Sequence, residues 1–129
     1  MPHAVVHRLS GAPPIDRRAI LEAVNRAFVD ALKVPQDTHP VRLCEYAADA
    51  FLVPRQCSGA FTLIEATIYP GRSITTKKRL YARMIAELGE AGIAADDIRI
   101  VLYEVPRQDW GLRGGIPASE IDLGFEVEI

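Results

Sequence analysis

A proline directly after the initiator methionine is the residue whose chemistry stands out most in this sequence. Methionine aminopeptidases act before small residues, so Pro2 favours removal of Met1, and the processed chain then begins with a secondary amine held in a ring. A free α-amino group titrates at about 7.7–8.0, and desolvation lowers that pKa because burial disfavours the charged form. A buried terminal proline can therefore act as a general base or acid near neutral pH. Many proteins begin with Met-Pro, so this role needs support from the rest of the chain.

The sequence contains none of the common catalytic motifs. It has no glycine-rich phosphate loop, no nucleophile elbow and no HExxH, although a triad assembled from scattered residues stays open. His3 and His7 would share one face of a strand, but at strand rise they lie about 13 Å apart, too far to chelate one ion. His39, Cys44 and Cys57 add no metal-ligand spacing. We expect no metal, no cofactor, and two free thiols in a reducing cytoplasm.

The overall composition is that of a folded domain without a dominant charge. Of the 129 residues, 49% are hydrophobic and 25% are charged, and the formal net charge is −2. Such a balance excludes a sequence-wide field that would attract nucleic acid or an anionic membrane. No apolar stretch approaches the roughly 20 residues that a membrane span needs, and the first residues lack the features of a secretion signal. We expect one cytoplasmic domain over residues 1–129.

The first half of the chain predicts a strand, a helix and a second strand. Residues 4–9 are rich in β-branched side chains, which is typical of a strand. Apolar residues then recur at three- and four-residue spacing over 15–33, as on one face of a helix. Val34-Pro35 ends this pattern, and a short polar loop leads to a second strand over 41–45.

The second half repeats this order. A strand is predicted over 61–69, and Ser73 is a suitable N-cap for a helix that runs to about residue 91. Gly92 follows as the C-terminal cap, and a last strand is predicted over 98–105. The two halves therefore form an internal pseudo-repeat, about 2–58 and 59–129. An apolar-Arg-apolar strand start in each half, at Arg42 and Arg99, gives a period of about 57 residues.

Two β-α-β units predict an α+β fold in which a four-stranded sheet carries both helices on one face. The strands within each unit should be parallel, with right-handed crossovers. The opposite sheet face would then be bare, and the strands are too apolar to leave it in water, so we expect oligomerisation through this face. The apolar strand residues behind this expectation are Leu63, Ile64, Ala66, Ile68, Ile98, Ile100 and Leu102. The alternating tail 123–129 predicts a further strand, added to a neighbour's sheet edge.

Several segments together resemble the tautomerase superfamily. They are Pro2 at the head of a strand, Tyr-Pro-Gly-Arg-Ser at 69–73, Lys-Lys-Arg-Leu-Tyr at 77–81, Glu-Val-Pro at 104–106 and Asp-Trp-Gly-Leu-Arg-Gly at 109–114. The last two match the longer members, of roughly 130 residues, that include malonate semialdehyde decarboxylase. The resemblance covers essentially the whole chain. It implies a homotrimer of β-α-β-β-α-β protomers with active sites near the subunit interfaces and a small carboxylate as substrate.

The resemblance also implies roles for individual residues. Pro2 takes the acid–base role, and Arg72 matches the anion-binding arginine just before the second helix, where a guanidinium can hold a carboxylate through two parallel hydrogen bonds. A structural role for Arg72, as a cap on the sheet or in a pair at a trimer interface, is the alternative. Trp110 would form an apolar wall that keeps the amine dry, although it would serve equally well as core or interface filler. Arg42 and Arg113 are candidates for a second substrate contact, and a structural ion pair is an equal alternative for each.

Three functions remain open at this point. With a neutral amine, Pro2 would move a proton between carbon and oxygen, which is keto–enol isomerisation of a small 2-oxo or enol carboxylic acid. A protonated amine fits malonate semialdehyde-type decarboxylation or hydration, and Asp37 matches an acid of that branch. Two observations argue against this branch. Pro70 stands where a second arginine is expected, and Asp96 occupies the place equivalent to Asp37 in the pseudo-repeat without any suggested chemistry. If Met1 is retained, the ring nitrogen is an amide, and a non-catalytic trimeric binding or scaffold protein is expected. We favour the isomerase.

Overall fold

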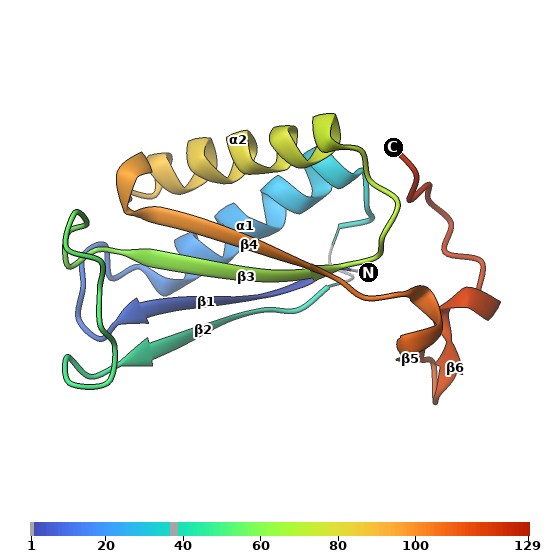
Figure 1. Ribbon diagram of the computed structural model, residues 1–129, viewed down its shortest axis with the longest axis horizontal. Helices are drawn as coiled ribbons and strands as arrows, with labels where there is room; N and C mark the ends of the chain where they lie inside the picture. Colours follow the sequence, from blue (N-terminus) through green and yellow to red (C-terminus); the bar gives the residue numbers. More distant parts are fainter. Residues whose placement is uncertain (1, 37–38) are drawn as a thin grey trace.

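The first three elements of the fold are those expected from the sequence. The computed structural model describes residues 2–36 and 39–129. Strand β1 (His3–Leu9) leads to helix α1 (Arg17–Leu32) and then to strand β2 (Val41–Tyr46) (Figure 1). The side chain of Asp16 caps α1 by accepting a hydrogen bond from the Ala19 backbone.

The second unit has the same order and ends in a small additional lobe. It comprises strand β3 (Thr62–Ile68), helix α2 (Ile74–Glu90) and strand β4 (Ile98–Glu104). Ser73 caps α2 as predicted, because its side chain accepts from the Thr76 backbone N–H. Beyond β4, short 3-10 helices at Arg107–Asp109 (η2) and Ala118–Glu120 (η3) flank a hairpin of β5 (Gly111–Leu112) and β6 (Ile116–Pro117). Another 3-10 turn, η1 (Ala95–Asp97), precedes β4.

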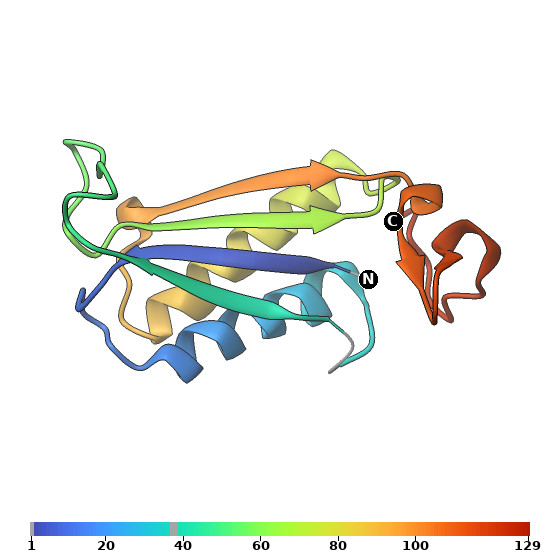
Figure 2. The ribbon, with the colours of Figure 1, turned by 90° about the horizontal axis from the view of Figure 1, so that it is seen from below.

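The four long strands form one mixed sheet in the order β2-β1-β3-β4. Strands are parallel within each β-α-β unit, as predicted, and the two units meet through the antiparallel pair β1–β3. Both helices lie on one face of this sheet (Figures 1 and 2). The predicted fold class is confirmed for these elements. Neither helix in the described parts of the chain is both long and apolar enough to cross a membrane.

The face of the sheet that carries no helix differs from our expectation. We expected seven apolar strand residues to form a face that a partner must cover. All of them except Leu63 belong instead to the core between the sheet and the helices: Ile64, Ala66, Ile68, Ile98, Ile100 and Leu102. Side chains alternate along a strand, so the even-numbered positions of β3 and β4 share the helix side. The open face instead mixes apolar groups such as Leu63 and Val101 with polar ones. The expectation of a broad apolar face was therefore wrong.

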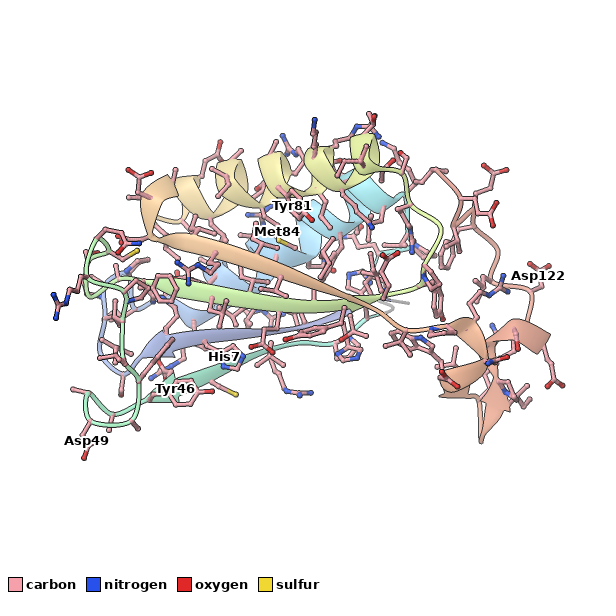
Figure 3. All side chains as sticks on the ribbon, viewed as in Figure 1. His7, Tyr46, Asp49, Tyr81, Met84 and Asp122 are labelled. Carbon is pink, nitrogen blue, oxygen red and sulfur yellow. The ribbon has the colours of Figure 1, made fainter. Side chains whose placement is uncertain are left out.

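Polar contacts on the open face confirm its mixed character. His7 Nδ1 lies 2.6 Å from the Tyr46 hydroxyl, and His7 Nε2 lies 3.7 Å from a carboxylate oxygen of Glu65. Figure 3 shows His7 and Tyr46 side by side below the sheet, whereas Met84 lies on the opposite side, beneath α2. Any partner that covers this face must accommodate polar groups as well as apolar ones.

The predicted C-terminal strand is absent from this single chain. Residues 123–129 form no strand, because the lobe after β4 carries the chain beyond the end of the sheet rather than along either edge strand (Figure 1). The tail packs instead on the segment between β3 and α2. The Ile129 carbonyl accepts hydrogen bonds from the Ser73 and Thr76 hydroxyls, and Val127 packs with Tyr69. Alternation along 123–129 reflects this one-sided packing.

Candidate active site

The start of β1 and the end of β3 lie at the same end of the sheet. These strands are antiparallel and pair His3 with Thr67, so continuing the register by one residue places Pro2 opposite Ile68. Pro2 is buried, on the same side of the strand as Ala4. The chain leaves β3 here and turns into α2. Residues from the beginning of the chain and from the β3–α2 connection are thereby brought to one place (Figure 2).

Arg72 is a buried cation without a counter-charge among the described residues. Only 5% of its surface is exposed, and Nη1 donates to the Tyr69 carbonyl at 3.2 Å. Its Nε and Nη2 have no hydrogen-bond partner in the part of the chain that the structure describes. Glu104, whose charge acts on the pKa of Arg72, is paired with Lys77 at 2.9 Å. Burial lowers the pKa of the guanidinium, yet arginine stays protonated in proteins, so this site favours an anion.

The backbone before α2 explains how Arg72 reaches this position. Gly71 has φ of 125°, a left-handed conformation that side chains rarely adopt, and a Cβ there would lie 3.1 Å from Glu128 Cγ in the tail. The turn directs Arg72 inward immediately before the Ser73 cap. The dipole at the start of α2 adds favourable potential for an anion beside the guanidinium.

Trp110 connects the two parts of the site. Its indole N–H donates to the Val105 carbonyl at 2.9 Å, which fixes the ring. Its ring meets His3 edge-on at a centroid distance of 5.5 Å and Tyr69 at 4.8 Å. Trp110 therefore contacts the residue after Pro2 and the residue whose carbonyl binds Arg72. This position is compatible with an apolar wall over the start of β1.

Tyr69 and His3 also belong to this end of the sheet, and the sequence analysis gave neither of them a role in the site. Tyr69 is 1% exposed, and its hydroxyl has no partner among the described residues. Burial raises the pKa of its phenol, while the charges of Arg107 and Arg72 act in the opposite direction. His3 has its pKa lowered by burial and then by the charge of Arg42, which favours a neutral imidazole beside Pro2. A buried aromatic at a strand end was the only signal available in the sequence.

The weaker candidates are not part of this cluster. Arg42 is exposed on β2, and its influence reaches His3 rather than Arg72. Arg113 is exposed in the β5–β6 turn, with φ of 48°, beside a cavity of about 200 Å³ that Leu123 and Phe125 also line. Asp37 lies outside the described residues. Within 2–36 and 39–129, no three His, Cys, Asp or Glu side chains are arranged to hold a metal ion.

A sizeable cavity lies beside the candidate site rather than in it. It measures about 550 Å³ and is lined by Pro70, Arg107 and residues of the tail. Neither Pro2 nor Arg72 lines this cavity. The tail, through Val127 and its neighbours, covers the approach to the β3–α2 connection. In this single chain the tail therefore lies against the turn that carries Arg72.

Solved structures with this architecture are tautomerase-superfamily proteins. A fused 4-OT, described as a wild-type symmetric trimer, is 27% identical, and the match covers 91% of this chain and 96% of that one with a TM-score of 0.79. A malonate semialdehyde decarboxylase inhibited by 3-bromopropiolate is 26% identical, with 85% and 88% covered and a TM-score of 0.76. Another malonate semialdehyde decarboxylase, at 22% identity and a TM-score of 0.78 over 85% and 89% of the chains, shares the fold.

The comparison with family models agrees with these structural matches. A model described as "Tautomerase enzyme" matches residues 39–113, from β2 through β3, α2 and β4 to the β5–β6 turn. This region includes Tyr69, Arg72 and Trp110 and spans more than half of the chain. The chain therefore belongs to the tautomerase enzyme family.

Proposed function

We propose that this protein is a keto–enol isomerase acting on a small 2-oxo or enol carboxylic acid, with the amine of Pro2 as its acid–base catalyst. The observation that carries the proposal is the buried Arg72, whose Nε and Nη2 donors have no partner among the described residues. Leaving such donors unpaired in the interior costs about 1–3 kcal/mol or more each. A substrate carboxylate would satisfy both with two parallel, charge-assisted hydrogen bonds.

The proposed reaction needs one proton acceptor and one oxyanion stabiliser. The neutral amine of Pro2 takes a proton from the enol oxygen, and the electron pair moves through the double bond so that the protonated amine returns the proton to carbon. Negative charge develops on the substrate oxygen in between and is stabilised by the charge of Arg72. Because Pro2 is buried, the pKa of its free amine would lie below that of an exposed terminus.

We further propose that the working assembly is a homotrimer. The fused 4-OT relative at 27% identity is described as a symmetric trimer. In this chain a partner has to cover the open face of the sheet, where Val101 and Tyr103 remain 37% and 48% exposed. The covered approach to Arg72 is consistent with a site whose entrance is completed by a neighbouring subunit.

The decisive experiment compares the wild type with Pro2→Ala. Intact mass establishes whether Met1 has been removed, and loss of the enol absorbance of phenylenolpyruvate measures isomerisation. Both chains begin with a free amine after processing, but only proline holds it in a ring. We expect activity to be lost in Pro2→Ala while size-exclusion chromatography shows the same trimer. Undiminished activity in this variant would reject the mechanism, and a retained Met1 would favour a non-catalytic scaffold.

Decarboxylation is the second candidate function, because a relative at 26% identity is a malonate semialdehyde decarboxylase. In that reaction Pro2 would act in its protonated form, and Arg72 would hold the carboxylate. Release of carbon dioxide from malonate semialdehyde, in the absence of phenylenolpyruvate turnover, would select this candidate over the isomerase.

A further inference from the structure

The phenol of Tyr69 is a buried hydrogen-bonding group that the proposed reaction does not yet use. Tyr69 follows the last residue of β3 and is 1% exposed. Its hydroxyl finds no partner among the described residues, although buried tyrosine hydroxyls usually do. An unmet donor in this position is expensive unless a ligand satisfies it.

The surroundings of Tyr69 hold its ring in one orientation. Trp110 packs against it edge-on at a centroid distance of 4.8 Å, and Val127 and Ala118 belong to the same buried cluster. The Tyr69 carbonyl accepts from Arg72 Nη1 at 3.2 Å. The Tyr69 backbone and the Arg72 side chain are thus joined across a single turn after β3.

A second guanidinium, that of Arg107, lies close to the same phenol. Arg107 Nη2 donates to the Ala118 and Ile121 carbonyls at 3.2 and 3.4 Å, which fixes the side chain, while its buried Nε has no partner among the described residues. Both Arg107 and Arg72 are near enough for their charges to act on the pKa of Tyr69. Neither arginine takes part in an ion pair among the described residues.

The phenol is a donor at neutral pH. Burial is the main influence on it and raises its pKa above the usual value, so the hydroxyl keeps its proton. Arg72 binds the Tyr69 carbonyl and Arg107 binds Ala118 of the same cluster, so the donors of these three residues lie near one another, and none of them has an acidic partner in the part of the chain that the structure describes. Such a cluster fits a ligand that carries a further oxygen acceptor beside its carboxylate better than it fits a simple carboxylate.

We propose that Tyr69 determines substrate specificity by donating a hydrogen bond to the 2-oxo oxygen of a substrate whose carboxylate is held by Arg72. Arg107 supports the negative charge that develops on this oxygen when Pro2 moves the proton. The Tyr69 phenol keeps its proton throughout and only donates a hydrogen bond. The single proton that moves is the one carried by Pro2. This inference rests on the proposed function, because it assigns the second oxygen of the same substrate class.

Binding can be tested without any turnover, because Trp110 is the only tryptophan in the sequence and lies against Tyr69. The probes are 2-oxobutyrate and butyrate, which differ only in the 2-oxo oxygen. Each is titrated into the full-length trimer while tryptophan fluorescence is recorded. We expect the wild type to bind 2-oxobutyrate about tenfold more tightly than butyrate, the value of one hydrogen bond.

The variants separate the two contacts. Tyr69→Phe should bind butyrate as the wild type does and lose the preference for 2-oxobutyrate. Arg72→Met should weaken both ligands. Tyr81→Phe is the matched control, since this half-buried tyrosine lies on α2, and it should keep the full preference (Figure 3). Arg107→Gln should reduce the preference without abolishing it, and supplies a second test if Tyr69→Phe does not fold.

Two results would overturn the inference: a preference that survives in Tyr69→Phe, or a wild type that binds both acids equally. Failure of the proposed function looks different. In that case Pro2→Ala keeps its turnover, or no enol is isomerised, while the fluorescence titrations still report whether Tyr69 reads the 2-oxo oxygen.

Discussion

Two arginines are buried at opposite ends of the same sheet, and they differ in how many hydrogen bonds their guanidinium groups make to the chain. Arg8, near the end of β1, is 3% exposed, and Arg72, after the end of β3, is 5% exposed. Arg8 donates to the Thr62 hydroxyl at 2.9 Å and to three backbone carbonyls of residues 12–14 at 3.3, 2.9 and 2.7 Å. Arg72 has one bond to the chain, to the Tyr69 carbonyl.

The bonds around Arg8 extend into a continuous network. The Thr62 hydroxyl donates to the Ala60 carbonyl, and the Ala60 N–H donates to the Ser58 hydroxyl. The Ser58 hydroxyl in turn donates to the carboxylate of Asp97. Burial alone therefore does not distinguish a structural charge from a functional one. The distinguishing feature is whether the protein's own acceptors fill the guanidinium's donor positions.

Replacing Arg72 by methionine should have the largest effect on function and little effect on folding. Loss of the carboxylate contact is expected to reduce kcat/KM for phenylenolpyruvate by about 10²–10³-fold, the usual range for a removed charge-stabilising donor. The free energy of unfolding should change by less than about 1 kcal/mol, because the substitution removes one hydrogen bond and also an uncompensated buried charge. Steady-state kinetics and urea denaturation measure the two quantities.

A second readout keeps this prediction independent of turnover. Butyrate at ten times its dissociation constant should stabilise the wild type by about 1.4 kcal/mol. The same concentration should leave Arg72→Met unchanged, since the anion then has no guanidinium to bind. Equal stabilisation of both proteins would show that the anion binds elsewhere. Arg72 would then have no anion-binding role to set it apart from Arg8.

Replacing Arg8 by methionine should have the opposite profile. The Thr62 hydroxyl and the carbonyls of 12–14 would lose their donor, and we expect the free energy of unfolding to fall by about 3 kcal/mol. The kcat/KM of the folded fraction should stay at the wild-type value, because Arg8 lies at the other end of the sheet from Pro2. Urea denaturation with parallel kinetics tests both expectations, and a stable but inactive Arg8→Met would contradict them.

The contrast also explains which parts of the molecule were predictable from the sequence. The β-α-β order, the Ser73 cap and the position of Gly92 depend on local patterns, and the structure confirms them. Sheet faces were harder, since assigning Ile64 or Leu102 to the helix side requires the strand register as well as the composition. The pseudo-repeat boundaries stay a prediction.

The sequence predicted only those residues of the site that belong to recognisable family motifs. Pro2, Arg72 and Trp110 came from the family resemblance, and the fold brings them to one end of the sheet. Tyr69 and Arg107 were given no role, because a buried phenol or guanidinium is recognised by its missing partners, which depend on three-dimensional packing. The spacing of residues in the sequence does not show which buried polar groups lack a hydrogen-bond partner in the fold.

The smallest effect should come from the carboxylate at the Arg8 end. The Ser58 hydroxyl and then its backbone N–H hold the pKa of Asp97 below its usual value. A carboxyl with a lowered pKa in the folded state stabilises the protein above its unfolded pKa of about 3.9, and this contribution disappears as the pH falls through the folded pKa. Ser58→Ala should therefore be less stable than the wild type at pH 7, and the difference should narrow below about pH 4.

Urea denaturation of both proteins between pH 3 and 7 measures this narrowing. Arg72→Met, titrated in parallel, should follow the wild-type pH dependence, because the Asp97 network lies at the other end of the sheet and is intact in that variant. A difference between Ser58→Ala and the wild type that is constant across this range would mean that the Asp97 contact contributes through packing rather than through charge. The Arg8 end of the sheet would then be stabilised by packing and hydrogen bonds alone. Of these buried groups, only Arg72 would act through its charge, by binding the substrate anion.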